Sequence, residues 1–316
     1  MMSKNEPISF DGIKSYPIKE RRSKVRIEDF GSPWKAGDSF KDWMDNLPGI
    51  LAGKDLITVA ERIVQAAKNR KTVILGMGAH PIKVGLNPLI IDLMKREIIT
   101  GIALNGAGII HDSELAMIGQ TSEDVSAGLG QGKFGMAEET GRLLNDAIIE
   151  GAANGKGLGQ AVGEMLVKEK FPHNNKSILA AAIDLEIPVT VHVAMGTDII
   201  HFHPKADGGA IGETSHKDFR IFSGLVSRLE NGVYINLGSA VIMPEVFLKA
   251  VTLVRNLGYK LGKITTVNMD FIRGYRPMTN VVHRPTLEGG EGFSMVGHHE
   301  IMFPLLAAAI IERLGK

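Results

Sequence analysis

Hydrophobic positions along the chain follow two alternating patterns. Short apolar runs rich in β-branched residues end in glycine or in a polar residue, which is typical of buried parallel strands. Segments with apolar residues at helical spacing separate these runs. The strand-like runs cover residues 71–78, 100–108, 188–198, 232–240 and 263–270, and the main helix-like segments cover 55–68, 86–97, 111–119, 176–187, 243–258 and 300–315.

The repeated order of strand, glycine and helix predicts an α/β fold with a Rossmann-like parallel sheet that helices cover on both faces. Because no clear linker interrupts residues 46–316, we expect a single domain there. Residues 1–45 are basic, punctuated by proline and only weakly periodic. They fit either a flexible tail or an arm that packs on a partner subunit. The mixture of apolar, aromatic and charged residues in "VRIEDFGSPW" favours the arm.

Composition narrows the class of protein. The net charge of +1 and the aromatic content of 6% argue against a generally basic nucleic-acid binder. The absence of cysteine excludes disulfides, thiolate metal sites and cysteine nucleophiles. The longest apolar run, near residues 301–311, is too short to cross a bilayer and contains Pro304. We therefore expect a cytoplasmic protein that binds neither nucleic acid nor membrane.

Ligands of such sheets bind outside the carboxyl ends of the strands. Glycine at these ends lets backbone N–H groups approach a ligand, and the helix that follows favours anions. Several predicted strands end in this way, at Gly76 and Gly78, at Asn105, Gly106 and Gly108, at Gly196, Thr197 and Asp198, at Gly238 and Ser239, and at Asp270. Together they predict a nucleotide-sized crevice, and glycines that simply form tight turns are the alternative.

Histidines gather near the same positions, at His80, His111, His201, His203, His298 and His299. Near a nucleotide crevice they can bind phosphate or transfer protons. An extended "HFH" segment places His201 and His203 on one face, a spacing that can ligate a metal ion. With the carboxylate of Asp198, these two residues form the alternative hypothesis of a metal-assisted hydrolase or lyase.

Five segments resemble the deoxyhypusine synthase superfamily in order and spacing over most of residues 28–315. They are "TVILGMGAHPIKVGLNPLIIDLMKR", "TGIALNGAGIIHDSEL", "KSILAAAIDLEIPVTVHVAMGTDIIHFH", "GVYINLGSAV" and "MFPLLAAAI". The resemblance implies a Rossmann-like sheet, NAD bound near a subunit interface, and a homo-oligomer, either a dimer or a tetramer built from tight dimers.

The resemblance also implies positions for the site. Asp198 matches an acidic residue that contacts the polyamine, and His298 and His299 stand where the family has an Asp-Ala pair. Together with the strand ends, the implied cofactor-binding residues are Gly76, Gly78, Ala79, His80, Asn105, Gly106, Ala107, Gly108, Gly238, Ser239, Ala240, Asp270 and His298.

The chain departs from the family in its chemistry. No lysine lies between Ile264 and Gly315, where the family has the lysine that forms an imine, so that covalent route is not available. The family's acidic stretch is replaced by "DFIRGYRPMTNVVHRPT", which carries Arg273, Arg276 and Arg284. Arginine is suited to bidentate binding of carboxylate or phosphate.

These observations predict an NAD-binding enzyme, an oxidoreductase or transferase, that acts on a small anionic substrate. The three arginines would hold the anion, and His80 or His299 would carry the proton. Asp112 or Asp198 would orient the histidine or the substrate. A non-catalytic nucleotide-binding module that kept the fold is a further alternative.

Overall fold

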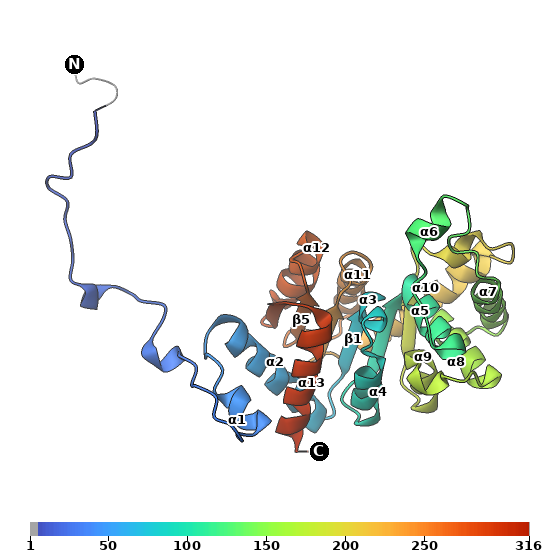
Figure 1. Ribbon diagram of the computed structural model, residues 1–316, viewed down its shortest axis with the longest axis horizontal. Helices are drawn as coiled ribbons and strands as arrows, with labels where there is room; N and C mark the ends of the chain where they lie inside the picture. Colours follow the sequence, from blue (N-terminus) through green and yellow to red (C-terminus); the bar gives the residue numbers. More distant parts are fainter. Residues whose placement is uncertain (1–5, 316) are drawn as a thin grey trace.

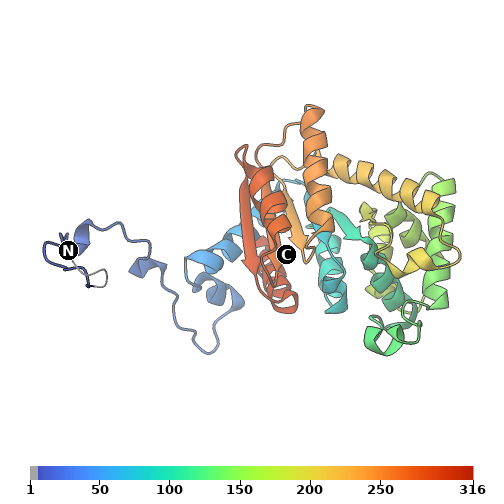
Figure 2. The same ribbon diagram turned by 90° about the horizontal axis from the view of Figure 1, so that it is seen from above.

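The computed structural model describes residues 6–315, and its centre is one parallel sheet of six strands in the order β3-β2-β1-β4-β5-β6. This is the strand order of a doubly wound Rossmann fold. Figures 1 and 2 show the sheet inside a shell of helices, with an extended N-terminal segment leading away from it. The strands are β1 Val73–Met77, β2 Gly101–Asn105, β3 Val189–His192, β4 Val233–Leu237, β5 Thr265–Asp270 and β6 Glu291–Val296.

Helices cover both faces of the sheet, as the sequence predicts. Alternate side chains of β1 belong to two separate cores: Leu75 packs with α2, α4, α5 and α13, and Ile74 packs with α10 and α11. The helices are α1 Phe40–Asp45, α2 Leu51–Lys68, α3 His80–Lys83, α4 Asn87–Lys95, α5 Gly106–Ile118, α6 Val125–Leu129, α7 Glu138–Ala153, α8 Leu158–Glu169, α9 Ile178–Asp184, α10 Gly208–Val226, α11 Ile242–Asn256, α12 Tyr275–Pro277 and α13 His299–Leu314. Shorter helical turns include η1 Ile18–Glu20, η2 Ile27–Asp29, η3 Asn174–Lys176, η4 Ile199–Phe202, η5 Met278–His283 and η6 Arg284–Thr286.

Several elements differ from the sequence prediction, among them helix α10, which was not predicted, the start of helix α5, and strand β6. Helix α5 begins at Gly106, directly after β2, because the Asn105 side chain accepts a hydrogen bond from the Gly108 N–H at 3.1 Å and caps the helix. Strand β6 was not predicted. It is an edge strand in which only Met295 is buried, so its sequence lacks the continuous apolar run of a central strand.

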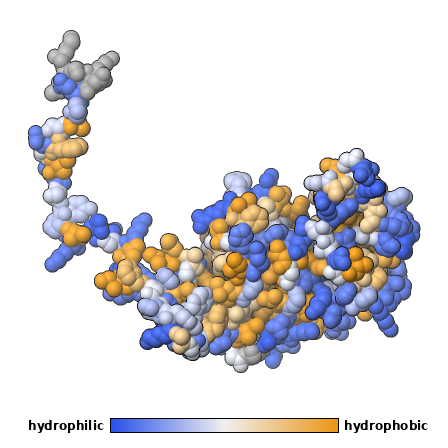
Figure 3. Space-filling view, in the orientation of Figure 1, coloured by the Kyte–Doolittle hydropathy of each residue, from blue (hydrophilic) through white to orange (hydrophobic). Residues whose placement is uncertain are grey.

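The predicted arm lies largely outside the packed body. Residues 6–38 have no regular structure beyond η1 and η2, and Figure 1 shows them extending away from the sheet. Helix α1 is different, since it packs on α13 and Arg313 Nη2 lies 3.5 Å from Asp45 Oδ1. Figure 3 shows apolar residues scattered along the extended segment. None of the described helices is long and apolar enough to cross a membrane.

Candidate functional site

The candidate site lies at the carboxyl edge of the sheet, around the point where the strand order reverses between β1 and β4. The chain leaves β1 towards β2 on one side, whereas β4 continues towards β5 on the other. Diverging connections of this kind create a ligand-binding region at the strand ends. The predicted turn residues after β1, β2, β4, β5 and β6 all follow strands whose carboxyl ends share this edge.

Glycine backbones connect neighbouring strand ends here. The Gly78 N–H donates to the Leu237 carbonyl at 3.1 Å, and the Gly238 N–H donates to the Met269 carbonyl at 2.9 Å. A Cβ atom on Gly78 would lie 2.5 Å from the Gly238 oxygen. Gly238 has a φ of +65°, and a Cβ atom there would lie 2.5 Å from Cε1 of His299. Both positions therefore require glycine because of close contacts within the protein, so tight turns explain them without a ligand.

Three aromatic rings meet beside these glycines. The His80 ring lies 5.2 Å from the His299 ring and 5.8 Å from the Phe271 ring, and the Phe271 and His299 centroids are 5.9 Å apart. His80 begins α3, Phe271 follows β5 and His299 begins α13, so three separate crossovers supply the cluster. His80 is exposed to solvent, whereas His299 is buried.

His299 has an unusual environment for a histidine. Both of its ring nitrogens are buried and lack a hydrogen-bond partner within residues 6–315. Its Nε2 atom lies 3.6 Å from Oδ1 of Asp270, the last residue of β5. Burial lowers the pKa of His299, and the negative charge of Asp270 and a long contact with the Met269 backbone oppose this shift. The ring is therefore mainly neutral at pH 7, and its nitrogens are enclosed by the protein without hydrogen bonds among the described residues.

The end of β2 forms the second half of the site. Helix α5 starts there, and its first turn contains Gly106, Ala107 and Gly108. Free backbone N–H groups at such a helix start favour anionic groups. The Asp198 carboxylate lies against this turn, since a Cβ atom on Gly106 would be 1.9 Å from Asp198 Oδ2. Oδ2 is buried without a hydrogen-bond partner in the described chain, and burial raises the pKa of Asp198.

His201 completes a dyad with Asp198, but His203 lies elsewhere. The N–H groups of Gly196 and Asp198 donate to His201 Nδ1 at 3.0 and 3.3 Å, which leaves Nε2 facing Asp198 Oδ2 at 3.7 Å. His203 instead packs on Gly141 of α7. No three histidine, aspartate or glutamate residues within the described part of the chain come together as a metal site. The structure thus separates the two histidines of the metal hypothesis.

The other predicted cofactor residues differ in what they offer a ligand. Gly76 packs under Tyr234, since a Cβ atom there would lie 2.4 Å from the tyrosine hydroxyl oxygen. The Ser239 hydroxyl accepts a hydrogen bond from the Met243 N–H at 3.1 Å, near the start of α11. Ala79 is half-buried, and Ala240 and His298 are exposed at the carboxyl edge.

Two predicted residues lie away from this edge. Asp112 is fully buried and accepts hydrogen bonds from Ser177 Oγ, Asn87 Nδ2 and the N–H groups of Ile178 and Leu179, at 2.5 to 3.0 Å. It caps α9 and has no lone pairs left for catalysis. Arg284 lies towards the amino edge, because the chain turns back after β5 and the Val281 carbonyl already accepts from Thr266 Oγ1, near the start of β5. Arg284 Nη1 donates to Asn280 Oδ1 at 3.0 Å.

The remaining two arginines do lie near the carboxyl end of β5. Arg276 Nε is 3.3 Å from Oε1 of Glu245 on α11, so its charge is paired. The Arg273 side chain is exposed and has no ion pair or side-chain hydrogen bond among the residues that the structure describes.

The structure adds features that the sequence did not predict. Phe271 contacts both histidines, yet its role depends on the path of the chain after β5. A pocket of about 330 Å³ lies at the end of β3 and is lined by residues that include His192, Ser215, His216 and Phe219. Burial lowers the pKa of His192 to about 3, so this ring is neutral.

The fold is similar to that of several proteins of known structure. The chain shares the fold of the deoxyhypusine synthase-like superfamily. A putative deoxyhypusine synthase from Entamoeba histolytica superposes with a TM-score of 0.50 at 12% identity, over 89% of this chain and 96% of the other. A putative LOR/SDH protein from Methanococcus maripaludis S2 gives a TM-score of 0.52 at 15% identity, over 84% and 71% of the two chains.

A third neighbour has a bound dinucleotide. AgrE in complex with ornithine and NAD⁺ superposes with a TM-score of 0.53 at 12% identity. The match covers 82% of this chain and 33% of AgrE, so this chain corresponds to about a third of that protein. The sequence itself matches no protein-family model and no curated protein, and the likeness is therefore one of fold.

Proposed function

We propose that the carboxyl edge binds NAD(H) and that the protein is an enzyme acting on a small anionic substrate. The observation that carries the proposal is the buried His299, with two unpartnered nitrogens beside Asp270, at an edge where Gly78 and Gly238 let neighbouring strand ends come into contact. The α5 N-terminus supplies N–H groups suited to a pyrophosphate. A structural neighbour crystallised with NAD⁺ supports the choice of cofactor.

The residues at the carboxyl edge would have separate roles in binding and proton transfer. The turns at 78–80, 105–108 and 238–240 would hold the dinucleotide, which supplies the hydride acceptor or donor. His80 is the exposed member of the aromatic cluster, so it would exchange a proton with the substrate. His299 and Phe271 fix the His80 ring by edge contacts. Asp270, at 3.6 Å, orients His299.

Arg273 is the residue best placed to bind the substrate anion. It is exposed in the loop directly after β5, close in sequence to Asp270 and Phe271. Its guanidinium has no intramolecular partner among the described residues, in contrast to Arg276, which pairs with Glu245. Arg276 would join only by leaving that pair, and the position of Arg284 removes it from the anion-binding set.

Titration with NAD and NADH while following thermal unfolding tests the cofactor. Ligand at about 100 times its dissociation constant adds about 2.7 kcal/mol to the free energy of unfolding. We expect a saturable rise in melting temperature, and its absence at millimolar cofactor would contradict the proposal. Saturable binding without turnover of carboxylate or phosphate substrates would instead indicate a non-catalytic nucleotide-binding module.

We also infer that the protein is a homo-oligomer in which the arm packs on a second copy. Large apolar side chains are exposed between residues 8 and 34 of the arm, at Ile8, Phe10, Ile13, Tyr16, Ile18, Val25, Ile27, Phe30 and Trp34. Such a series in water is the signature of a covered surface. Light scattering of the full chain and of a variant lacking residues 1–37 tests this. An unchanged mass would contradict it.

A further inference from the structure

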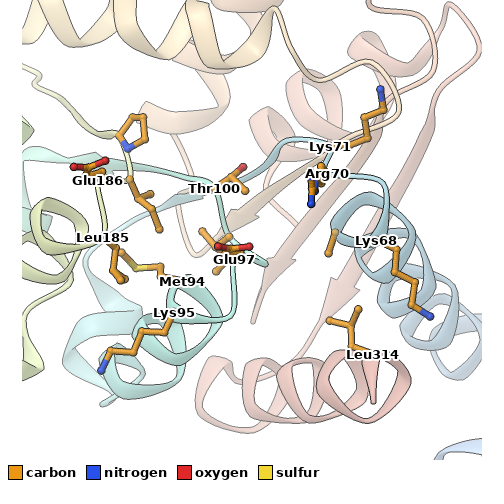
Figure 4. Close-up of a pocket in the computed structure, with 14 residues that line it drawn as sticks. Lys68, Arg70, Lys71, Met94, Lys95, Glu97, Thr100, Leu185, Glu186 and Leu314 are labelled. Carbon is orange, nitrogen blue, oxygen red and sulfur yellow. The ribbon is translucent and has the colours of Figure 1, made fainter. Parts of the chain in front are cut away.

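A second hollow lies at the opposite edge of the sheet. It has a volume of about 710 Å³, within the range of small-molecule sites, and lies where β1, β2 and β3 begin. Figure 4 shows its lining. The apolar part of the wall includes Met94, Ile99, Leu185, Ile187 and Leu314. The charged part consists of Lys68, Arg70, Lys71, Lys95, Glu97 and Glu186.

Three of the charged residues occupy the same position in three equivalent turns. Arg70, Glu97 and Glu186 follow α2, α4 and α9, and all are left-handed, with φ values of +52°, +57° and +54°. In each turn the next N–H donates back into the helix: Lys71 to Ala66, Ile98 to Leu93 and Ile187 to Ala182. Glycine is the residue that this helix-ending position favours. Charged residues at all three places therefore need a reason beyond the backbone.

The charges are ordered across the pocket. Because β1 pairs with β2 and β2 with β3, the turns that precede them are neighbours along the edge. The order from β1 to β3 is Arg70, then Glu97, then Glu186, so a positive side faces a negative side. Neither Arg70 nor Glu97 forms an ion pair within residues 6–315. A ligand with a positive and a negative group would match both.

Lys68 and Lys95 have a structural role that needs no ligand. Lys68 and Lys95 lie in the last turns of α2 and α4, where a cation stabilises the helix end without any ligand. In Figure 4 their ammonium groups point away from the middle of the pocket on opposite sides, and Glu97 lies between them. Arg70, Lys71, Glu97 and Glu186 are thus the charged side chains left for a bound molecule, beside the apolar wall.

We infer that this pocket binds a small zwitterion with an apolar body, of the amino-acid or dipeptide class. Arg70 binds its carboxylate, Glu97 binds its ammonium group, and Met94, Leu185 and Leu314 contact its apolar part. The site is independent of the carboxyl-edge proposal, since the two regions lie at opposite edges of the sheet.

Isothermal titration of the full chain with L-leucine and L-leucyl-L-leucine tests the inference. We expect saturable binding of at least one probe. We expect at least tenfold weaker binding of 4-methylpentanoate, which lacks the ammonium group, and of 3-methylbutylamine, which lacks the carboxylate. No saturable binding of either probe, or equal binding of 4-methylpentanoate and leucine, would overturn it.

Glycine variants give a control against misfolding, because glycine suits the left-handed backbone. Arg70→Gly and Glu97→Gly should each weaken probe binding at least tenfold. Asn231→Gly is the matched control, since Asn231 has a φ of +62° in the turn before β4 and does not line this pocket. The exchange of both charges, Arg70→Glu with Glu97→Arg, should restore part of the binding. Unchanged binding in Glu97→Gly would sink the assignment.

Discussion

The two edges of the sheet show opposite ways of ending and starting strands. At the carboxyl edge, small residues let backbones touch, as where a Cβ atom on Gly78 would meet the Gly238 oxygen at 2.5 Å. Polar atoms of His299 and Asp198 are buried there without hydrogen-bond partners in the described chain. At the amino edge, long charged side chains such as Arg70 and Glu97 occupy turns that favour glycine, around an open pocket.

The two edges differ in the free energy that a bound ligand can gain. A buried polar group without a partner costs about 1–3 kcal/mol, and a ligand that supplies the partner recovers it. The carboxyl edge therefore gains from a ligand through buried groups that are already in place. The amino edge gains only through side chains that water otherwise solvates, so its binding is expected to be weaker. Each variant below alters one side of this comparison.

The largest expected loss of stability comes from Asp112, a buried residue that lies behind the carboxyl edge. Asp112→Ala would leave the N–H groups of Ile178 and Leu179, together with Ser177 and Asn87, without their acceptor. We expect a loss of about 3 kcal/mol or more in the free energy of unfolding, measured with urea. Asp198→Asn is the control and should change it by less than about 1 kcal/mol. If both variants lost the same unfolding free energy, Asp198 would have a structural role like that of Asp112.

A glycine pair measures the crowding of the carboxyl edge. Gly238→Ala combines a positive φ with a Cβ atom 2.5 Å from His299, whereas Gly258 has a φ of +81° and nothing within 4 Å. We expect a loss of about 2–4 kcal/mol for Gly238→Ala and about 1 kcal/mol for Gly258→Ala. Similar losses in urea unfolding would contradict the close contact between the β4 turn and α13.

These contrasts show how far the sequence leads. Apolar runs that end in glycine or in a polar residue predicted five of the six strands and the carboxyl-edge turns, because buried parallel strands and tight turns leave local signals. Strand β6 lacked such a signal, since it is half exposed at the edge of the sheet. The metal hypothesis assumed an extended "HFH" segment, but η4 turns His201 towards Asp198 and leaves His203 against α7.

Local sequence patterns could not predict which residues far apart in the chain lie close together in the fold. Arg284 seemed part of one basic stretch with Arg273, but the helical turns α12, η5 and η6 carry it towards the amino edge. Asp112 was predicted near the start of a helix as a residue that orients a histidine or the substrate, but its carboxylate accepts hydrogen bonds from the first turn of α9 instead. The meeting of Phe271 with two histidines depends on three crossovers and could not be predicted from spacing.

The acid dependence of stability tests the buried histidine. Burial holds the pKa of His299 below its usual value, so the unfolded chain binds a proton at a higher pH than the folded chain. Stability should therefore fall as pH drops below about 6.5, with a slope from this residue of at most about 1.4 kcal/mol per pH unit. Urea unfolding between pH 7 and pH 5 should show a shallower slope for His299→Gln. An unchanged slope would show that groups other than His299 cause the pH dependence of stability.

The smallest effect concerns the amino edge. Arg70→Gly should raise the free energy of unfolding by up to about 1 kcal/mol, because it relieves the left-handed backbone at φ +52°. Lys71→Gly, at the next residue without a positive φ, should lower it by about 0.5–1 kcal/mol. Urea unfolding of both variants gives the comparison. A loss for Arg70→Gly would show that its side chain stabilises the protein without any ligand.

The most direct test of the account is calorimetric binding of NADH to a variant with an added charge at the carboxyl edge. Ala107→Glu places an acid in the first turn of α5, which suits the helix but repels a pyrophosphate. Gln160→Glu adds the same charge to the first turn of α8 as a control. We predict that NADH binds the wild type and Gln160→Glu equally, and binds Ala107→Glu at least tenfold more weakly. Equal binding by all three proteins, or none by the wild type, would contradict it.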